Sequence, residues 1–287
     1  MPFTATEWAT WLAQEENRLR KVYLISPGHL IAEHRREREI THGYHGREIL
    51  ELLQNAGDTA RNAGVRGRVH IVVTKQGVVM GNTGCPFDQG GVESLLTANL
   101  SPKRKREAVV IGDKGLGFRS ILNWTDAPVI SSGELSLAFL PDYAAEVLRG
   151  LEAESDDLGK RVAAELEIGG DLIVPRLAFP QWIPDWSEHS WPESAGLRTI
   201  AEACQHLRGE GFATAIGMPF AEKRSHEEAV RQVDELSPEF LLLVESIGRL
   251  EIEIEGRPGK VWTCEPTNQR QTIWEGEKVW RFAVLSG

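Results

Sequence analysis

The chain has 287 residues, of which 41% are hydrophobic and 26% charged, and this excludes a disordered or fibrous protein. With 32 Lys and Arg against 42 Asp and Glu, the formal charge of −10 argues against broad affinity for duplex DNA or anionic lipid. No stretch approaches the roughly 18 apolar residues of a membrane span, and the N-terminus lacks an export signal. Three cysteines at spacings that match no zinc or redox motif indicate reduced thiols. We therefore expect a cytoplasmic protein without a membrane partner.

The opening region is expected to be helical. Thr4 and Glu7 form a capping box in front of an amphipathic run of Trp and Leu residues. The Ser26-Pro27 pair supplies the cap and the first-turn proline of a second, charged helix. A longer helix is predicted from about Tyr44 to Gly64, so that residues 1–43 form an N-terminal helical segment.

The pattern changes at Arg68 to one typical of β-strands. Two apolar runs, VHIVV and VVM, flank the turn-forming residues 75–77 and predict a β-hairpin. A glycine-rich stretch from Gly81 to Gly117 follows, with one short helical run near 92–98, and this is where we expect the function to reside. Two further strands are predicted at about 128–130 and 135–140.

The second half of the chain is expected to add another set of strands. Residues 141–195 carry no sustained period, and we interpret them as an insertion. A helix at about 197–207, a strand at about 212–218 and a helix that begins at Ser237 are predicted next. The alternating LEIEIEG and the segments KVWTC and KVWRFAV predict antiparallel strands between about 248 and 284.

A helix face with three oxygen-bearing side chains is the first candidate site. In ELLQNAGDTA, at about 100° per residue, Glu51, Asn55 and Asp58 fall at about 0°, 40° and −20°, so they project together. Carboxylates and an amide arranged in this way can hold Mg²⁺ or an activated water. The alternative is an ordinary solvated helix face, because these residue types are common on exposed helices.

Two glycine-rich elements form the second candidate feature. GNTGCPF begins at Gly81 directly after a predicted strand, and IGDKGLGFRS contains Gly112, Gly115 and Gly117 ahead of a short helix. Glycines let backbone N–H groups approach a phosphate, and a helix N-terminus adds partial positive charge there. The spacing matches neither the dinucleotide fingerprint nor the Walker pattern. Each element alone is also compatible with a surface loop.

Taken in order, these motifs resemble the GHKL superfamily, which includes gyrase, the ninety-kilodalton heat-shock chaperone, histidine kinases and the MutL proteins. The likeness is greatest to its sacsin-type branch, where segments similar to GREILELLQNAGDTA, GNTGCPF, IGDKGLGFRSILNWTDAPVISSG and ATAIGMPF occur in this order. It covers about 44–140 and 211–250. The resemblance implies the Bergerat ATP-binding fold, a single α/β domain over residues 1–287 with a mixed, mostly antiparallel sheet, helices on one face and a mobile lid over ATP.

The resemblance also implies roles for the helix face. Glu51 would be the catalytic base that activates the attacking water, Asn55 would bind Mg²⁺ through its side-chain oxygen, and Asp58 would support the nucleotide pocket. Asn82 would meet the adenine amino group, where most of the superfamily has aspartate. An asparagine oxygen can accept that hydrogen bond, but its NH₂ group can also donate, so selection of adenine over guanine stays open.

Further roles are implied for the glycine-rich elements. Gly84 would let the backbone pass under the base, and Thr214 would lie near the adenine. Lys114 is a candidate for phosphate binding, although a lysine in such a loop can also point to water. The lid would begin at about Thr97 and would cover the phosphates with Gly112, Gly115, Leu116, Gly117 and Phe118.

Other features have plainer interpretations. The basic run from Lys103 to Arg106 could reach phosphates or a nucleic-acid strand, but a solvated loop is the simpler interpretation. His29, Glu33 and His34 lack the His-Glu-x-x-His spacing, and we expect them on the surface without a metal. Three tryptophans within 182–191 favour core or lid packing over a partner-binding patch.

The function implied by the resemblance is ATP binding with Mg²⁺ and slow hydrolysis that drives conformational change in a larger chaperone-like or defence-related protein. The partners would then be ATP and downstream domains or a protein partner. The alternative is a nucleotide-binding scaffold or protein-interaction module that does not hydrolyse ATP. Asn82 and the insertion motivate that alternative.

Overall fold

The structure is a computed structural model that describes residues 2–97, 117–168, 172–192, 196–267 and 270–283. In this part of the chain the strands form one ten-stranded sheet with the order β10-β9-β8-β7-β1-β2-β6-β3-β4-β5. Neighbouring strands are antiparallel, except that β1 and β7 run parallel. The expected α+β class with a mixed, mostly antiparallel sheet is confirmed. The strands are β1 (Gly67–Val73), β2 (Gly77–Asn82), β3 (Val129–Ser132), β4 (Leu135–Ala138), β5 (Gln181–Trp182), β6 (Thr214–Pro219), β7 (Ile247–Ile254), β8 (Lys260–Thr267), β9 (Arg270–Glu275) and β10 (Lys278–Ala283).

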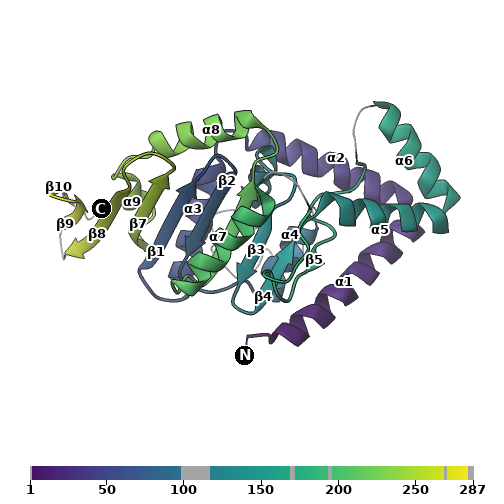
Figure 1. Cartoon of the computed structure of the whole chain (residues 1–287), viewed down its shortest axis with the longest axis horizontal. Coiled ribbons are helices and arrows are strands. Elements are labelled where there is room, and N and C mark those ends of the chain that lie inside the picture. The colour runs from purple at the N-terminus through teal and green to yellow at the C-terminus, as the bar shows by residue number, and fades with distance from the viewer. Residues whose placement is uncertain (1, 98–116, 169–171, 193–195, 268–269, 284–287) are drawn as a thin grey trace.

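Helices lie over the sheet and at one end of it (Figure 1). None of the helices in the described ranges combines the length and the apolar character that crossing a membrane needs. The helices are α1 (Ala5–Ile25), α2 (Pro27–Gly43), α3 (Glu48–Asn62), α4 (Gln89–Leu96), the 3₁₀ helix η2 (Gly117–Asn123), α5 (Pro141–Glu154), α6 (Asp156–Ile168), α7 (Leu197–Gly209), α8 (Lys223–Asp234) and α9 (Phe240–Leu243).

The centre of the sheet packs against α3. Val69 and Ile71 of β1 and Val78 and Met80 of β2 are buried in the same core as Leu52 of α3. Alternate residues of a strand share a face, so the predicted hairpin places these four side chains together under the helix. Burying them against the apolar side of α3 fixes the helix over the ends of β1 and β2.

Helix α7 lies on the opposite face of the sheet, so the expectation of helices on one face was wrong. Val79, which alternates with the residues that face α3, belongs to a second core that also holds Ile200 of α7. A Cβ at Gly217 of β6 would lie 2.6 Å from Ile200, so the glycine lets α7 pack directly on the sheet. Trp186 and Trp191 are buried in this second core, with ring centroids 5.6 Å apart.

The segment 141–195 contains two helices, α5 and α6, that sequence reasoning did not find. They pack with α1 and α2 at one end of the sheet (Figure 1). An acidic run at residues 152–157 spans the break between the two helices. Ser155 is the C-cap of α5, and α6 begins at the next residue. A break within the run interrupts the apolar period on which a sequence-based prediction depends.

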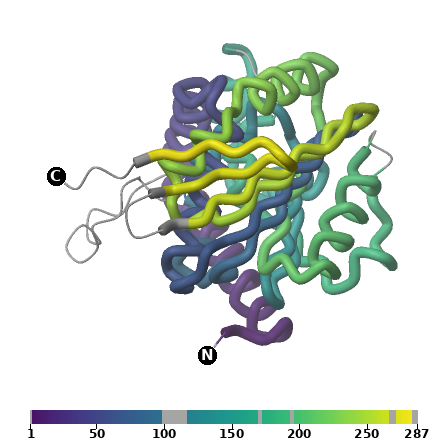
Figure 2. The backbone as a smooth tube through the Cα atoms, turned by 90° about the vertical axis from the view of Figure 1, so that its left-hand side faces the viewer, coloured from purple at the N-terminus to yellow at the C-terminus, as the bar shows by residue number. Residues whose placement is uncertain are grey.

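The C-terminal strands β7 to β10 lie side by side at one edge of the sheet (Figure 2). The prediction of strands in this region is confirmed, and β9 is an additional one. Ser237 precedes only the single turn of α9, whereas the longer α8 was missed. The described core contacts of α8 include Ala229 and Val233, two small apolar residues in a mostly charged segment, which explains its weak pattern.

A buried carboxylate joins the N-terminal helices to the rest of the molecule. Glu37 of α2 is 2% exposed and accepts hydrogen bonds from the backbone N–H groups of Arg176, at 2.6 Å, and Leu177, at 3.3 Å. Its other neighbour is Arg119 of η2, whose Nε lies 3.9 Å from Glu37 Oε2. Burial raises the pKa of Glu37, and the Arg176 and Arg119 guanidinium groups oppose that rise.

Arg119 also bonds to α4, so the contact with Glu37 connects α2 to that helix. Its guanidinium donates to the carbonyl oxygens of Ser94, at 3.2 Å, and Leu95, at 2.7 Å, at the C-terminal end of that helix. A cation there is favoured because the last carbonyl groups of a helix carry partial negative charge. Glu37 and Arg119 therefore hold α2, η2 and α4 together.

Replacing Glu37 should destabilise the fold more than any exposed change on the same helix. We expect Glu37→Ala to lower the free energy of unfolding by about 3–5 kcal/mol, because it removes the buried carboxylate that faces the Arg119 charge and accepts from the backbone of Arg176 and Leu177. Glu39→Ala, at an exposed position of α2, should change it by less than about 0.5 kcal/mol. Urea unfolding of both variants measures this, and equal losses would contradict the assigned role.

Candidate functional site

A cavity of about 180 Å³ lies between α3, α4, η2 and the strands β2 and β6. Five residues singled out from the sequence line it, namely Asn55, Asp58, Asn82, Phe118 and Thr214. The apolar part of the lining is formed by Leu52, Ala56, Met80, Pro86, Phe87, Leu95, Phe118 and Ile216. The polar part is formed by Asn55, Asp58, Thr59, Asn62, Asn82, Asp88, Ser94 and Thr214.

The strand register explains why residues distant in the sequence meet here. Asn82, the last residue of β2, pairs with Thr214, the first residue of β6. Both are almost fully buried, with 4% and 2% of their surface exposed. The Thr214 hydroxyl lies 2.6 Å from that of Ser132, which in turn accepts the backbone N–H of Phe87 at 2.9 Å. One side of the cavity is thus a polar floor at the ends of three strands.

The predicted helix face is present on α3, and its three residues have different surroundings. Asn55 and Asp58 line the cavity, and Asp58 also pairs with Arg61, with Nη1 and Oδ1 2.8 Å apart. Glu51 lies beside the cavity rather than in the described part of its lining. The helical geometry was therefore predicted correctly, but it brings two of the three side chains into the cavity wall.

Glu51 lies between the Arg47 guanidinium and the first residue of η2, Gly117. Its Oε1 is 3.3 Å from Nη2 of Arg47, one turn earlier on the helix. Burial raises the pKa of Glu51, and the positive charge of Arg47 lowers it. A Cβ at Gly117 would overlap Oε2, so the glycine allows the backbone of η2 to lie directly against the carboxylate.

Gly84 lies against α3. Its φ of 125° is in the region that favours glycine, and an added Cβ would lie 2.7 Å from the carbonyl carbon of Thr59. The next residue, Cys85, donates its backbone N–H to the Thr59 carbonyl oxygen at 3.2 Å. This glycine therefore lets the chain after β2 pass close to the helix and form the cavity wall.

Sequence reasoning missed Thr59 and Ser132. The hydroxyl of Thr59 accepts a hydrogen bond from Asn82 Nδ2 at 3.1 Å. The signal was available, since Thr59 is four residues after Asn55 and falls on the same helix face. Ser132 had no such signal, because its role depends on the pairing of β3 with β6.

Several predicted residues lie outside the described part of the chain. These are Gly112, Lys114, Gly115, Leu116 and the basic run from Lys103 to Arg106. The lid from Thr97 to Gly117 is described only at its two ends. Where the described chain resumes after the predicted lid segment, Phe118 lies in the cavity wall and Gly117 lies against Glu51.

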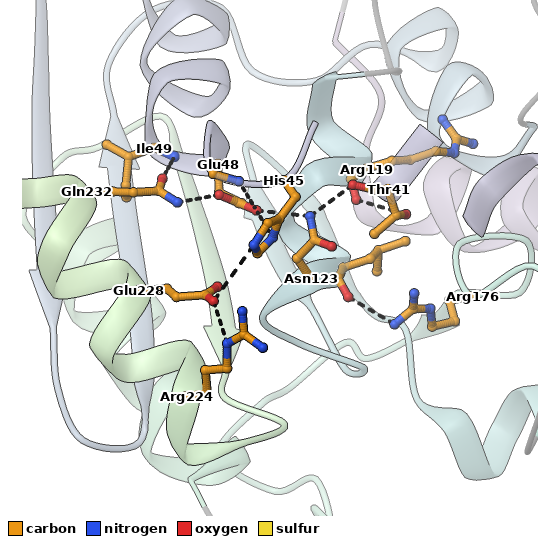
Figure 3. Close-up of polar contacts among 12 residues, drawn as sticks. Thr41, His45, Glu48, Ile49, Arg119, Asn123, Arg176, Arg224, Glu228 and Gln232 are labelled. Carbon is orange, nitrogen blue, oxygen red and sulfur yellow. Dashed lines mark hydrogen bonds and ion pairs between the residues drawn. The ribbon is translucent and has the colours of Figure 1, made fainter. Parts of the chain in front are cut away.

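A buried polar cluster holds the first turn of α3 (Figure 3). Glu48 is fully buried and accepts hydrogen bonds from Asn123 Nδ2 at 2.9 Å, from the Gly46 N–H at 3.1 Å and from Gln232 Nε2. His45 Nδ1 lies 3.6 Å from the same carboxylate. Because Asn123 belongs to η2 and Gln232 to α8, the cluster fixes both elements against the start of α3, next to the candidate base.

Histidines and carboxylates do not assemble a metal centre among the described residues. Contrary to the expectation of a surface cluster, Glu33 and His34 are buried. Glu33 accepts a hydrogen bond from Tyr23 at 2.5 Å and lies 3.2 Å from His29, and His34 Nδ1 is 3.2 Å from the Val174 carbonyl oxygen. These contacts join α1, α2 and the segment after α6.

The fold and the site define a mixed α/β protein with a partly polar cavity between a helix and the ends of central strands. No family model matches the sequence. The chain is similar to Protein NO VEIN of Arabidopsis thaliana, with 27% identity over 200 residues. That similarity covers 68% of this chain and 6% of NO VEIN, so the chain spans a small part of that relative's length.

A side chain at Gly117 should move the Glu51 carboxylate. The three atoms nearest to a Cβ there all belong to the Glu51 side chain, whose flexible end can turn away, so we expect Gly117→Ala to change the free energy of unfolding by about 1 kcal/mol or less. Gly159→Ala on α6 is the matched control, because its Cβ would have no neighbour within 4 Å and the substitution should stabilise the helix by about 0.5–1 kcal/mol. Chemical denaturation tests both, and a much larger loss in Gly117→Ala would show that the Glu51 carboxylate cannot move away.

Proposed function

We propose that the chain is an ATP-binding module of the GHKL type, with the Bergerat fold and a lid that closes over the phosphates. One observation carries the proposal. Residues drawn from four separate sequence motifs, namely Asn55, Asn82, Phe118 and Thr214, line a single cavity. A shared ligand would give these distant motifs a common purpose, and the cavity combines apolar walls with polar groups, as small-molecule sites do.

The lining suits the parts of a nucleotide. Met80, Ile216 and Leu52 offer apolar surface to a planar base, while Asn82 and Thr214 offer hydrogen-bonding groups beside it. Asn55 presents an amide oxygen in the same cavity. Mg²⁺ is commonly held by one or two protein oxygens together with substrate phosphates and water, so Asn55 fits as its ligand. When bound, the ion would neutralise phosphate charge.

Hydrolysis is assigned to Glu51 as the base. A carboxylate in partly buried surroundings has a raised pKa, which makes it a better proton acceptor once it is ionised. The Arg47 charge keeps the ionised form available, and the carboxylate lies against Gly117, next to the proposed lid. Closure of the lid would then position the base.

A non-hydrolysing scaffold is the second candidate, and the Arg47–Glu51 ion pair favours it. The Glu51 carboxylate is paired with the Arg47 guanidinium, so it has a partner other than the water that a base would activate. Under either candidate, the chain would act as one module of a larger chaperone-like or defence-related protein. The similarity to a small part of NO VEIN supports a modular role.

Calorimetric titration with ATP and Mg²⁺ tests the binding proposal. We expect saturable binding, and at about 100 times the dissociation constant the ligand should add roughly 2.7 kcal/mol to the stability. Asn55→Ala should lose the Mg²⁺ dependence of affinity, whereas Gln54→Ala, at the exposed neighbouring position, should keep it. No heat and no thermal shift with wild-type protein would rule out nucleotide binding.

Turnover separates the two candidates. If the module hydrolyses ATP, Glu51→Gln should lower kcat by roughly 10²-fold or more with affinity nearly unchanged. Arg47→Ala should raise the pKa of Glu51, so that kcat falls at higher pH than in wild type as the solution is acidified, and Arg47→Lys should restore the profile. An equal, measurable kcat in wild type and Glu51→Gln would rule out Glu51 as the base, and absence of turnover in the wild type would favour the scaffold.

A further inference from the structure

Strand β2 ends in a side chain whose orientation decides which ligands the cavity accepts. Asn82 is 4% exposed and lines the cavity. An asparagine presents NH₂ donors on one side and an acceptor oxygen on the other, and the two orientations favour opposite ligands. The groups around the amide determine which atom faces the cavity.

The hydroxyl of Thr59 fixes that orientation. It donates its single proton to the backbone carbonyl oxygen of Ala56, 2.9 Å away. Toward Asn82 Nδ2, at 3.1 Å, it can therefore only accept. The backbone carbonyl oxygen of Thr83, 3.2 Å from Nδ2, is also an acceptor only. Both neighbours require the NH₂ group, and the opposite orientation would place the amide oxygen against two other oxygens.

With Nδ2 bonded to Thr59 and Thr83, Oδ1 is the side-chain atom of Asn82 that can accept a hydrogen bond from a ligand. Its two Nδ2 protons are used by Thr59 and Thr83, and no residue within the described ranges donates to Oδ1. The backbone of Asn82 is held in the sheet by pairing with Val69 and Thr214, so the side chain has a fixed origin. The cavity therefore presents a fixed acceptor between its apolar walls.

We propose that Thr59, acting through Asn82, makes the cavity selective for 6-aminopurines over 6-oxopurines. This inference rests on the proposed nucleotide function and adds a residue that sets its specificity. Adenine carries a donor at C6, whereas guanine and hypoxanthine carry an acceptor there. An acceptor that faces the C6 substituent stabilises the first and repels the others, and a site built around one hydrogen bond discriminates strongly against ligands that lack it. Thr59 is a positioning residue in this scheme.

Binding of three diphosphates tests the inference without turnover. Calorimetry with the Mg²⁺ complexes of ADP, GDP and inosine diphosphate should show wild-type protein binding ADP at least about 100-fold more tightly than the other two. Thr59→Val removes one of the two acceptors that hold Nδ2, so the orientation of the amide is less strongly fixed and the preference should fall by about tenfold or more. Thr59→Ser keeps the hydroxyl and should restore it.

Asn82→Asp provides a test that does not depend on the stability of Thr59→Val. A carboxylate accepts in either orientation, so this variant should prefer ADP as the wild type does. If Asn82 instead presented its NH₂ group to the ligand, the wild type would prefer GDP and inosine diphosphate, and Asn82→Asp would reverse that preference. Such a reversal would overturn the inference.

The remaining outcomes are distinct from one another. Equal wild-type affinity for the three diphosphates would overturn the selectivity while leaving nucleotide binding intact. An unchanged preference in folded Thr59→Val would overturn the role of Thr59 alone. Absence of binding for all three, together with no thermal shift, would overturn both the proposed function and this inference.

Discussion

The candidate site depends on the attachment of α3 to the end of β2 at Thr59. Its carbonyl oxygen accepts the N–H of Cys85, its hydroxyl accepts from Asn82, and Gly84 lies against its backbone. A side chain at Gly84 would push the chain away from the helix and separate the two walls. The cavity is thus the space left between a helix and strands that are held together by direct polar contacts at one place.

Two buried polar groups fix the other walls of the cavity in the same way. Glu48 ties η2 and α8 to the start of α3, and Glu37 with Arg119 ties α2 to η2 and α4. Buried charges are costly unless they are paired and hydrogen-bonded, and both carboxylates have such partners. Because η2 takes part in both groups, a shift of η2 would also displace the helices that are bonded to it.

Glu51 lies where these constraints meet. It is one turn after Glu48, its carboxylate faces Arg47, and Gly117 of η2 lies against it. A small movement of η2 would change the surroundings of this carboxylate without disturbing the sheet. The arrangement gives a physical means by which a ligand in the cavity and the Glu51 carboxylate beside it can influence each other.

The sequence by itself determined the helix face of α3 and the β1–β2 hairpin, because each follows from a local period of 3.6 or 2 residues, and the resemblance of its motifs implied the α+β class. It also selected Asn55, Asn82, Phe118 and Thr214, which share the cavity wall. Only the tertiary structure decided that α7 covers the second face, that the acidic segment forms α5 and α6, and that Thr59 orients Asn82. These features depend on strand order, on side chains that meet across the sheet and on hydrogen-bond partners far apart in the chain, and no local pattern encodes such pairings.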